Sequence, residues 1–217
     1  MEYLLIKVSP QPEPASFDSD IRKPGARFLA KNPRPTAKQF ARYSYWRRAH
    51  HDLYKLYSGI CAYCASWSPF SGKSVDGTSV DHFIPKSIDP NMAYEWKNYR
   101  LCRSRLNEHK TDTLQVVDPF FIQDGWFTID FLSFLLKPNR AEPMYIQARV
   151  LTSIQVLDLN HKDYVSERIS VIAEYCRGHL RLDQVKAKWP FIAAEMLRQN
   201  FDTEYMPKMI SFFRRMP

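Results

Sequence analysis

The stretch SVDHFIPKSIDPNMAYEWKNYRLCRSRLNEHK, residues 79 to 110, decides the fold of this chain of 217 residues. It begins with a strand-like run from Ser79 to Ile84, and a second strand-like run extends from Asn98 to Cys102. Helix-forming residues follow directly, from about Arg103 to Lys110. The stretch therefore predicts two short strands and then a helix.

Asp81 and His82 stand side by side in the first predicted strand. Histidine is the only side chain whose unperturbed pKa suits a general base near pH 7, and a carboxylate supplies the hard oxygen that Mg²⁺ prefers. Adjacent residues of a regular strand point to opposite faces, so both can serve one site only if the strand ends or bends here. Pro85 supports this, because proline cannot continue a regular central strand.

Asn107 and Lys110 are three residues apart in the predicted helix and therefore share a face. In this arrangement Asn107 supplies a second oxygen ligand to the metal, while Lys110 meets a phosphate. His109 lies about 200° from Asn107 around the helix and is expected to point elsewhere. Asp81 and Asn107, together with a substrate phosphate, fit the habit of Mg²⁺, which takes few protein ligands and keeps several waters.

The pattern D-H-F-I-P-K-S, W-K-N-Y-R-L and R-L-N-E-H-K resembles the motif of HNH nucleases, in which a strand hairpin and a helix hold one divalent ion. The resemblance implies that Asp81 and Asn107 are metal ligands and that His82 is the general base. It also implies that Asn98, the middle Asn of the motif, braces the loop and the base. The interval of nine residues from Asn98 to Asn107 is similar to that in the HNH domains of CRISPR effector nucleases. The third letter of the motif is Asn rather than His, a variant that the family tolerates.

The four cysteines of the chain are Cys61, Cys64, Cys102 and Cys176. Without an export signal they are expected to be thiols or metal ligands rather than a disulfide framework. In many HNH proteins a structural zinc site begins at the position of Cys61 and Cys64, and a second pair lies shortly before the helix Asn. Cys102 keeps one position of that second pair, but Arg105 occupies the other. Three cysteines need a further ligand, such as His109, to close a tetrahedral site, so the sequence favours metal-free cysteines over zinc.

Composition and charge narrow the class of protein. The formal net charge of +8 and the pI near 9.3 favour polyanionic partners, nucleic acid first and an anionic membrane surface second. A basic protein with no such partner is the alternative. The N-terminus MEYLLIKVSP has only a short apolar run, so no signal peptide and a cytoplasmic location are expected. The most apolar later stretch, Trp126 to Leu136, is far too short to span a membrane.

The region before the motif divides into two parts. Residues 1 to 35 contain six prolines and scattered charge, which predicts an extended Pro-rich arm. Residues 36 to 125 are expected to form the HNH nuclease core, with a leading helix that Thr36 caps and Gly59 ends. The apolar stripe of that helix consists of Tyr43, Trp46, Leu53, Tyr54 and Tyr57.

Residues 126 to 217 are expected to form strands or loops up to Val150 and then a helical appendage. Asn160 is expected to cap a helix that Gly178 closes. Two further helices are expected, from Asp183 to Asn200 and from Asp202 to Met216. The whole chain therefore predicts an α+β fold, with a ββα-metal core, an N-terminal helix and a C-terminal helical region.

A second resemblance rests on Asp118-Pro119-Phe120, on Gly125-Trp126-Phe127, and on Leu157-Asp158-Leu159-Asn160 followed by Arg168. These segments are similar to bacterial HNH proteins of phage-defence operons, notably the Septu nuclease subunit PtuB, also found beside some retrons. That family works with a partner ATPase, PtuA. The resemblance implies the effector nuclease of an antiviral defence complex, whose Pro-rich arm or helical tail would dock the ATPase.

Together these features predict an endonuclease that hydrolyses phosphodiester bonds with Mg²⁺, for which Mn²⁺ is an expected substitute. DNA is the expected substrate by resemblance, and RNA remains open because basic charge serves either polymer. The rival hypothesis is a non-catalytic nucleic-acid-binding adaptor that keeps the HNH fold for structure. Asp81 and His82 argue against this rival, since a binding module needs neither a base nor a metal.

Overall fold

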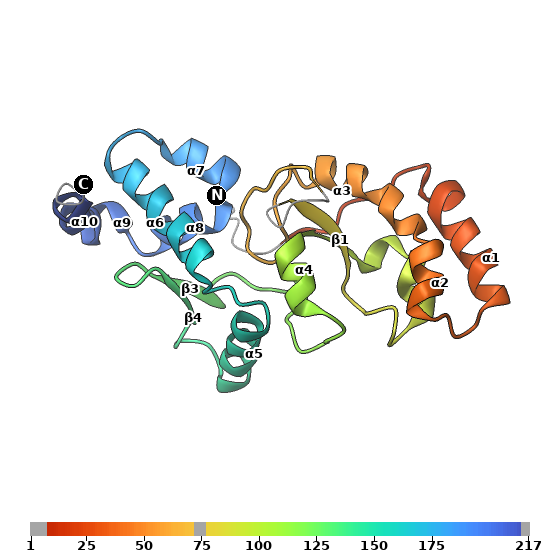
Figure 1. Ribbon diagram of the computed structural model, residues 1–217. Coiled ribbons are helices and arrows are strands. Elements are labelled where there is room, and N and C mark those ends of the chain that lie inside the picture. Colours follow the sequence, from red (N-terminus) through yellow and green to blue (C-terminus); the bar gives the residue numbers. More distant parts are fainter. Residues whose placement is uncertain (1–7, 72–76, 214–217) are drawn as a thin grey trace.

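The computed structural model describes residues 8–71 and 77–213, which form an elongated α+β molecule (Figure 1). The first helices lie at one end, the last helices lie at the other, and the stretch with the predicted motif lies between them (Figure 1). The described strands form two separate two-stranded antiparallel sheets. Within the same residues, no helix has the length and apolar character needed to cross a membrane.

The central stretch forms the two strands and the helix that its sequence predicts. β1 (Thr78–His82) pairs with β2 (Tyr99–Arg103), and α4 (Ser104–Lys110) begins directly after β2. In this register Asp81 lies opposite Arg100, and His82 lies opposite Tyr99. Two 3₁₀ helices, η3 (Pro90–Tyr94) and η4 (Trp96–Asn98), lie in the connection between the strands. α4 packs against both strands and completes a ββα unit.

Residues 18 to 31 are helical, so the prediction of an extended arm over residues 1 to 35 is wrong for that part. Residues 1 to 7 of the predicted arm lie outside the described residues. A π-helix, η1 (Asp18–Arg22), continues directly into α1 (Lys23–Lys31). Pro24 is the second residue of α1 and has no N–H with which to continue the wider hydrogen-bond pattern of η1.

Burial explains why this segment folds despite its prolines. Phe17, Ile21 and Phe28 recur at helical spacing and are buried, with at most 5% of their surface exposed. Packing of an apolar face stabilises a helix more than local propensity does. In the sequence, the prolines indicate an extended arm, whereas the spacing of these apolar residues indicates the helix that forms.

The single helix predicted to begin at Thr36 is divided into three elements. These are α2 (Ala37–Arg42), η2 (Tyr45–Ala49) and α3 (His50–Leu56). Thr36 caps α2 as predicted, because its hydroxyl accepts from the Gln39 N–H while the Gln39 side chain accepts from the Thr36 N–H. Where the helix breaks, Tyr43 stacks on Phe28 with ring centroids 4.5 Å apart. Gly59, at a φ of 72°, follows the end of α3 in the left-handed conformation that glycine tolerates.

The N-terminal helices and one face of β2 enclose a hydrophobic core, here called the N-terminal core. Every residue of the predicted stripe belongs to it, with Leu53 buried and the four aromatic residues packed around it. Its buried members are Phe17, Ile21, Phe28, Phe40, Ala49, Leu53, Ala93, Tyr94, Trp96, Tyr99 and Leu101.

The C-terminal half begins with a hairpin of β3 (Phe127–Asp130) and β4 (Leu135–Pro138). The helices that follow are α5 (Met144–Val156), α6 (Lys162–Cys176), α7 (Leu182–Lys188), α8 (Pro190–Arg198), α9 (Phe201–Glu204) and α10 (Met206–Phe213). The start of α5 at Met144 lies inside the region predicted as strands or loops, because β-branched residues in Met144–Val156 obscured its helical spacing.

The cap predicted at Asn160 is wrong by one residue, since His161 is the N-cap of α6. The Asn160 side chain instead accepts from the Leu136 N–H and donates to the Leu136 carbonyl. It therefore ties the start of α6 to β4. Gly178 closes α6 with a φ of 76°, as the sequence predicts.

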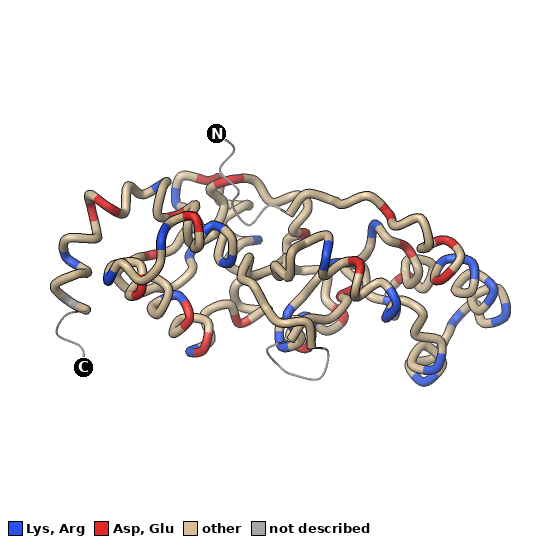
Figure 2. The backbone as a smooth tube through the Cα atoms, turned by 90° about the horizontal axis from the view of Figure 1, so that it is seen from above, with Lys and Arg blue, Asp and Glu red and all other residues tan. Residues whose placement is uncertain are grey.

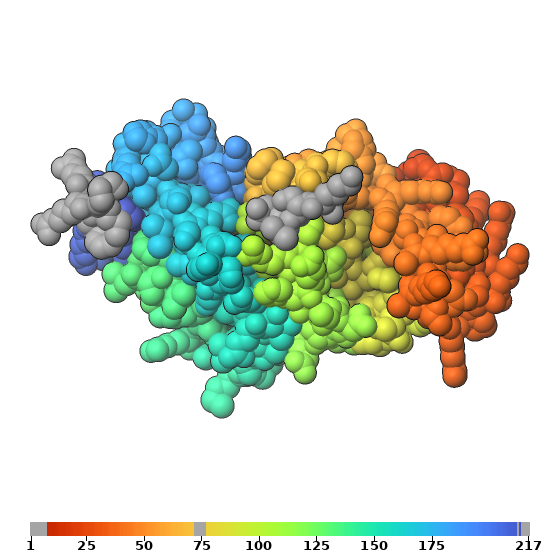
Figure 3. Space-filling model, viewed as in Figure 1, coloured from red at the N-terminus to blue at the C-terminus, as the bar shows by residue number. Residues whose placement is uncertain are grey.

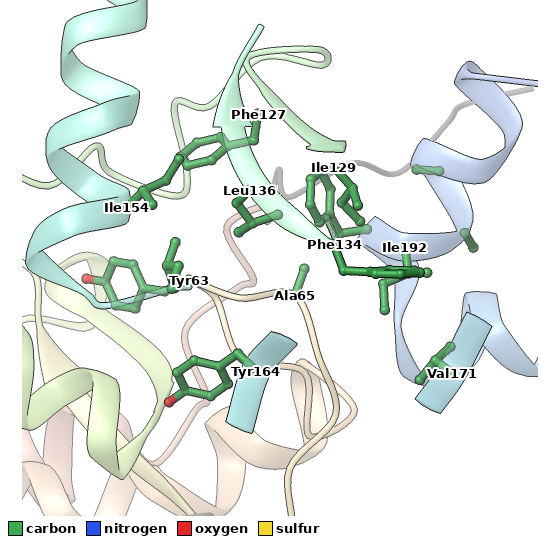
Figure 4. Packing of buried hydrophobic residues seen from close by; sticks show 14 of the residues in the cluster. Tyr63, Ala65, Phe127, Ile129, Phe134, Leu136, Ile154, Tyr164, Val171 and Ile192 are labelled. Atoms are coloured by element: carbon green, nitrogen blue, oxygen red, sulfur yellow. The ribbon is translucent and has the colours of Figure 1, made fainter. Parts of the chain in front are cut away.

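A second core, here called the C-terminal core, joins the ββα unit to this half. Figure 4 shows Tyr63 and Ala65 from the loop before β1 packing with side chains of the β3–β4 hairpin, α5, α6 and α8. Cys102 of β2 and Leu106 of α4 belong to the same cluster. The hairpin β1–β2 thus lies between two cores.

Candidate active site

His82 is the last residue of β1 and is 5% exposed. Its Nε2 lies 2.9 Å from the carbonyl oxygen of Ala93, which can only accept, so Nε2 carries a proton. Nδ1 is then the basic nitrogen when the ring is neutral, and it lies 3.3 Å from the ammonium of Lys86. The rings of Trp46 and Tyr99 hold the imidazole edge-on at centroid distances of 5.1 and 5.2 Å. The tautomer and the orientation of His82 are therefore both fixed.

Burial lowers the pKa of His82 well below its ordinary value, and the positive charge of Lys86 lowers it further. The hydrogen bond to Ala93 opposes these effects and does not overcome them. A neutral imidazole with one free basic nitrogen is the form that a general base requires.

Asp81 points to the opposite side of β1, toward α4. Its Oδ2 accepts a hydrogen bond of 2.5 Å from the hydroxyl of Tyr63, and its Oδ1 lies 3.2 Å from the ammonium of Lys110. The carboxylate is 2% exposed. β1 is regular through both residues, because Asp81 pairs with Arg100 and His82 pairs with Tyr99, so their side chains point to different faces. The bend that the sequence analysis expected, which would bring both side chains into one site, does not occur between Asp81 and His82.

The sequence analysis expected Lys110 to reach outward to a phosphate, and this expectation is wrong. Its side chain is completely buried, and its ammonium donates to Asp81 and to the carbonyls of His82 and Phe83, at 3.0 and 3.1 Å for the two carbonyls. An ammonium has three donors, and all three are used. Lys110 therefore fixes the end of β1 from behind, because α4 places it against the strand rather than at the surface.

Asn107 lies one turn before Lys110 on α4, as its spacing predicts, and is half-buried. Its Nδ2 donates to Ser79 Oγ at 3.1 Å and to the Val80 carbonyl at 3.4 Å. Within the part of the chain that the structure describes, Oδ1 of Asn107 has no hydrogen-bond partner. This amide oxygen is available to a ligand.

A pocket of about 570 Å³ opens beside Asn107. Arg47 is an exposed cation at its edge, and His50 is half-buried in it, with its Nε2 2.9 Å from Thr78 Oγ1. The complete lining is Trp46, Arg47, His50, Thr78, Ser79, Val80 and Asn107. The pocket therefore joins the helix α4, the strand β1 and the basic helical region before it.

Asn98 braces the loop that follows His82. Its Oδ1 accepts from the Ile84 N–H at 2.7 Å, while its Nδ2 donates to the carbonyls of Ile84 and Met92 at 2.9 and 3.0 Å. The side chain is 2% exposed. Its hydrogen bonds hold the segment just before Ala93, the partner of His82, so Asn98 is a positioning residue.

Asp81 and Asn107 are the two oxygen donors that a hard cation such as Mg²⁺ would use at this unit. Asp81 uses two of about four lone-pair positions on its carboxylate, and Oδ1 of Asn107 is free. Both side chains lie on the face of β1 that meets α4, because Asn107 bonds Ser79, which shares that face with Asp81. A site of this kind has two protein oxygens and takes the rest from water and phosphate. Among the described residues there is no group of three or more His, Cys, Asp and Glu side chains suited to a metal.

Three of the cysteines converge behind the hairpin. Cys61 and Cys102 are buried in the C-terminal core, and Cys61 Sγ accepts from the Arg103 N–H at 3.3 Å. Burial and the neighbouring thiol of Cys102 raise the pKa of Cys61 to about 12. Arg105, at the position where a fourth cysteine was missing, lies 2.5 Å from Asp163. Whether Cys61, Cys64 and Cys102 hold zinc stays a prediction.

Two contacts at the site were missed by the sequence analysis. Tyr63 lies between Cys61 and Cys64, and nothing in the local pattern indicates its hydrogen bond to Asp81. Lys86 stands four residues after His82, within the motif, but no role was assigned to it. Its ammonium also lies 4.8 Å from the ring centroid of Trp46. These contacts depend on the tertiary arrangement of the loop.

Comparison with known proteins adds no relative to this picture. No known protein family matches the chain, and a search of curated proteins also finds no match.

Proposed function

We propose that the chain is a metal-dependent nuclease of the HNH type that hydrolyses phosphodiester bonds, with DNA as the first substrate. The observation that carries the proposal is the state of His82 at the end of a ββα unit. Its Nε2–H is committed to Ala93, its Nδ1 keeps a lone pair, and its lowered pKa keeps the ring neutral near pH 7.

In this proposal His82 Nδ1 accepts the proton of the attacking water. Lys86 must first move away from Nδ1, and its long half-buried side chain permits this. Ala93 keeps the imidazole in place throughout, and its carbonyl stabilises the protonated ring after the transfer. General base catalysis of this kind typically contributes about 10² to 10⁴ in rate.

Asp81 and Asn107 would hold the metal ion, Mg²⁺ by preference and Mn²⁺ as a substitute. When bound, the ion supplies positive charge against the developing charge of the phosphate. Arg47 at the edge of the pocket offers a phosphate contact from the protein itself. It takes the role that the buried Lys110 cannot fill.

The non-catalytic adaptor is the second candidate, and two observations favour it. Asp81 and His82 point to different faces of β1, so the proposed metal ligand and the proposed base do not share one side of the strand. Both oxygens of Asp81 already have donors, and the buried ammonium of Lys110 balances its charge. In an adaptor this pair would only hold α4 on β1. The two hypotheses differ in what Asp81 does when a divalent cation is present.

Work within a defence complex with a PtuA-like ATPase is proposed on the sequence resemblance alone. The structure changes how this proposal is tested. Phe17, Ile21 and Phe28 are part of the N-terminal core, so deleting residues 1 to 35 would disturb the protein's interior. Exposed substitutions are the better probe of docking.

The decisive experiment incubates the full chain with linear DNA, plasmid DNA and RNA, in Mg²⁺, Mn²⁺ or EDTA, with and without an ATPase partner. We expect cleavage that requires a divalent cation and is lost in His82→Ala. His109→Ala is the matched control, since His109 is an exposed histidine on the same unit. Nucleic-acid binding without cleavage under every condition would instead support the adaptor.

A further inference from the structure

Residues 18 to 48 account for most of the net positive charge of the chain. They contain nine Lys and Arg residues against two Asp residues, a net +7 within a total of +8. These residues form α1, α2 and η2 at one end of the molecule (Figure 3). Seen from above in Figure 2, basic positions outnumber acidic ones along these helices.

Most of these cations have no acidic partner. Arg22 and Lys23 form ion pairs with Glu13, Asp18 or Glu95. Seven of these side chains form no ion pair with any residue that the structure describes. One of them, Arg48, donates to the Asp20 carbonyl. The other six are exposed, namely Arg27, Lys31, Arg34, Lys38, Arg42 and Arg47. Here this set is called the basic end. Like charges held together without counter-charges attract a polyanion.

The basic end contains a pocket of about 250 Å³ between α1 and the break after α2. Arg27 and Lys31 line it from one face of α1, one helical turn apart, and Tyr43 and Tyr45 line it from the other side. Two cations at the wall of one pocket suit a phosphate group.

The aromatic rings at this pocket are engaged. Tyr43 stacks on Phe28 and carries the guanidinium of Arg42 at 5.7 Å from its centroid. The guanidinium of Arg48 lies 5.2 Å from the ring centroid of Tyr45. Stacking on a nucleic-acid base needs a free ring face. These rings are therefore better suited to holding the guanidiniums than to binding bases, which favours contact with the sugar-phosphate backbone.

The basic end leads directly to the candidate active site. η2 places Tyr45 at the 250 Å³ pocket and the next two residues, Trp46 and Arg47, at the pocket beside Asn107. Trp46 also contacts the imidazole of His82. A backbone bound at the basic end can thus continue along η2 toward the proposed base.

A lipid surface is a poorer occupant. Helices that lie on membranes insert large apolar side chains below the charged ones. Among residues 18 to 48, all within the described part of the chain, none is an exposed large apolar side chain.

We propose that the basic end is a binding surface for the phosphate backbone of duplex nucleic acid, with Arg27 and Lys31 clamping one phosphate, and that it delivers the duplex to His82. Delivery rests on the proposed nuclease function, whereas binding does not. A duplex, in which both backbones follow a regular path, suits cations spread over three helical elements.

The test measures the affinity of the full chain for a duplex of about 20 base pairs in EDTA, over a series of salt concentrations. The variant carries Arg27→Gln, Lys31→Gln, Arg34→Gln and Lys38→Gln. Each lost phosphate contact should reduce the slope of log affinity against log salt by about 0.9. We expect a reduction of two to four such steps, and a loss of affinity on the order of tenfold or more at moderate salt.

The matched control removes four exposed charges from the C-terminal half, with Arg140→Gln, Arg149→Gln, Lys186→Gln and Lys208→Gln, and should keep the wild-type slope. A wild-type slope in the first variant, an equal loss in the control, or tighter binding of anionic vesicles or polyglutamate than of duplex overturns the proposal. Because EDTA prevents cleavage, this result does not depend on whether the chain is a nuclease.

Discussion

The ammonium of Lys110 lies 3.2 Å from Oδ1 of Asp81, and both side chains are closed to solvent. The same ammonium donates to the carbonyls of His82 and Phe83, at the point where β1 ends. One residue of α4 thus joins the proposed metal ligand to the backbone of the proposed base. Their relative position depends on this buried contact.

Replacing Lys110 should therefore cost stability. Lys110→Met removes the buried donor of Asp81 Oδ1 and of two carbonyls, and breaking a buried pair in this way typically costs about 3 to 5 kcal/mol. Urea unfolding followed by circular dichroism measures the change. Lys97→Met, at an exposed lysine, should change the free energy of unfolding by less than about 0.5 kcal/mol. The role assigned to Lys110 is wrong if both variants unfold alike.

Asn98 should tolerate neither Ala nor Asp. Asn98→Ala removes three hydrogen bonds, and Asn98→Asp cannot donate to the carbonyls of Ile84 and Met92. Each buried group left unsatisfied costs about 1 to 3 kcal/mol. Cleavage should fall with stability, because the loop that orients His82 loosens. Asn91→Ala, an exposed control in the same loop, should retain both properties.

Stability should decrease below pH 6.5 because of His82. Its folded pKa lies well below 6.5, so between these values the unfolded chain takes up a proton that the folded chain does not. As the pH decreases below 6.5, the free energy of unfolding then decreases by up to about 1.4 kcal/mol per pH unit for this one group. Urea titrations at pH 7 and pH 5.5 should show the decrease, and His82→Gln should reduce it.

His50 provides the comparison for that experiment. Burial lowers its pKa as well, so it contributes in the same direction. It is only half-buried, and His50→Gln should remove a smaller part of the pH dependence than His82→Gln does. Equal slopes in wild type and His82→Gln would show that the imidazole of His82 titrates normally in the folded protein.

The thiol of Cys61 should react slowly. With its pKa raised to about 12 from an ordinary 9.0, its thiolate fraction at pH 8 is about 10³-fold lower than that of a free cysteine. The protein purified without added metal should contain less than one zinc per chain. Thiol titration in native buffer and in denaturant, beside metal analysis, checks both statements. Stoichiometric zinc that raises the melting temperature would reveal a fourth ligand.

The local parts of the fold could be predicted from the sequence, and the contacts between distant segments could not. β1, β2 and α4 follow from short runs with clear local preferences, and Thr36 follows from a capping pattern within four residues. The hydrogen bond from Tyr63 to Asp81 spans eighteen positions of chain and depends on how the loop before β1 folds back.

The candidate site shows the same division. The spacing of Asn107 and Lys110 correctly places them one turn apart on one helix, but spacing cannot tell whether that face meets solvent or a strand. Asn107 lies at a pocket edge, whereas Lys110 lies against the end of β1. At the N-terminus, the proline content likewise predicts an extended arm. Burial of Phe17 and Ile21 instead stabilises a helix there.

β2 is buried along its whole length, with Tyr99 and Leu101 in the N-terminal core and Cys102 in the C-terminal core. A fragment that kept the ββα unit and lacked either half would leave one face of this strand bare to water. Such a fragment should aggregate or bind chaperones when expressed. The smallest piece that can be handled in isolation is therefore close to the full chain, and hydrogen exchange at the amides of β2 should be among the slowest.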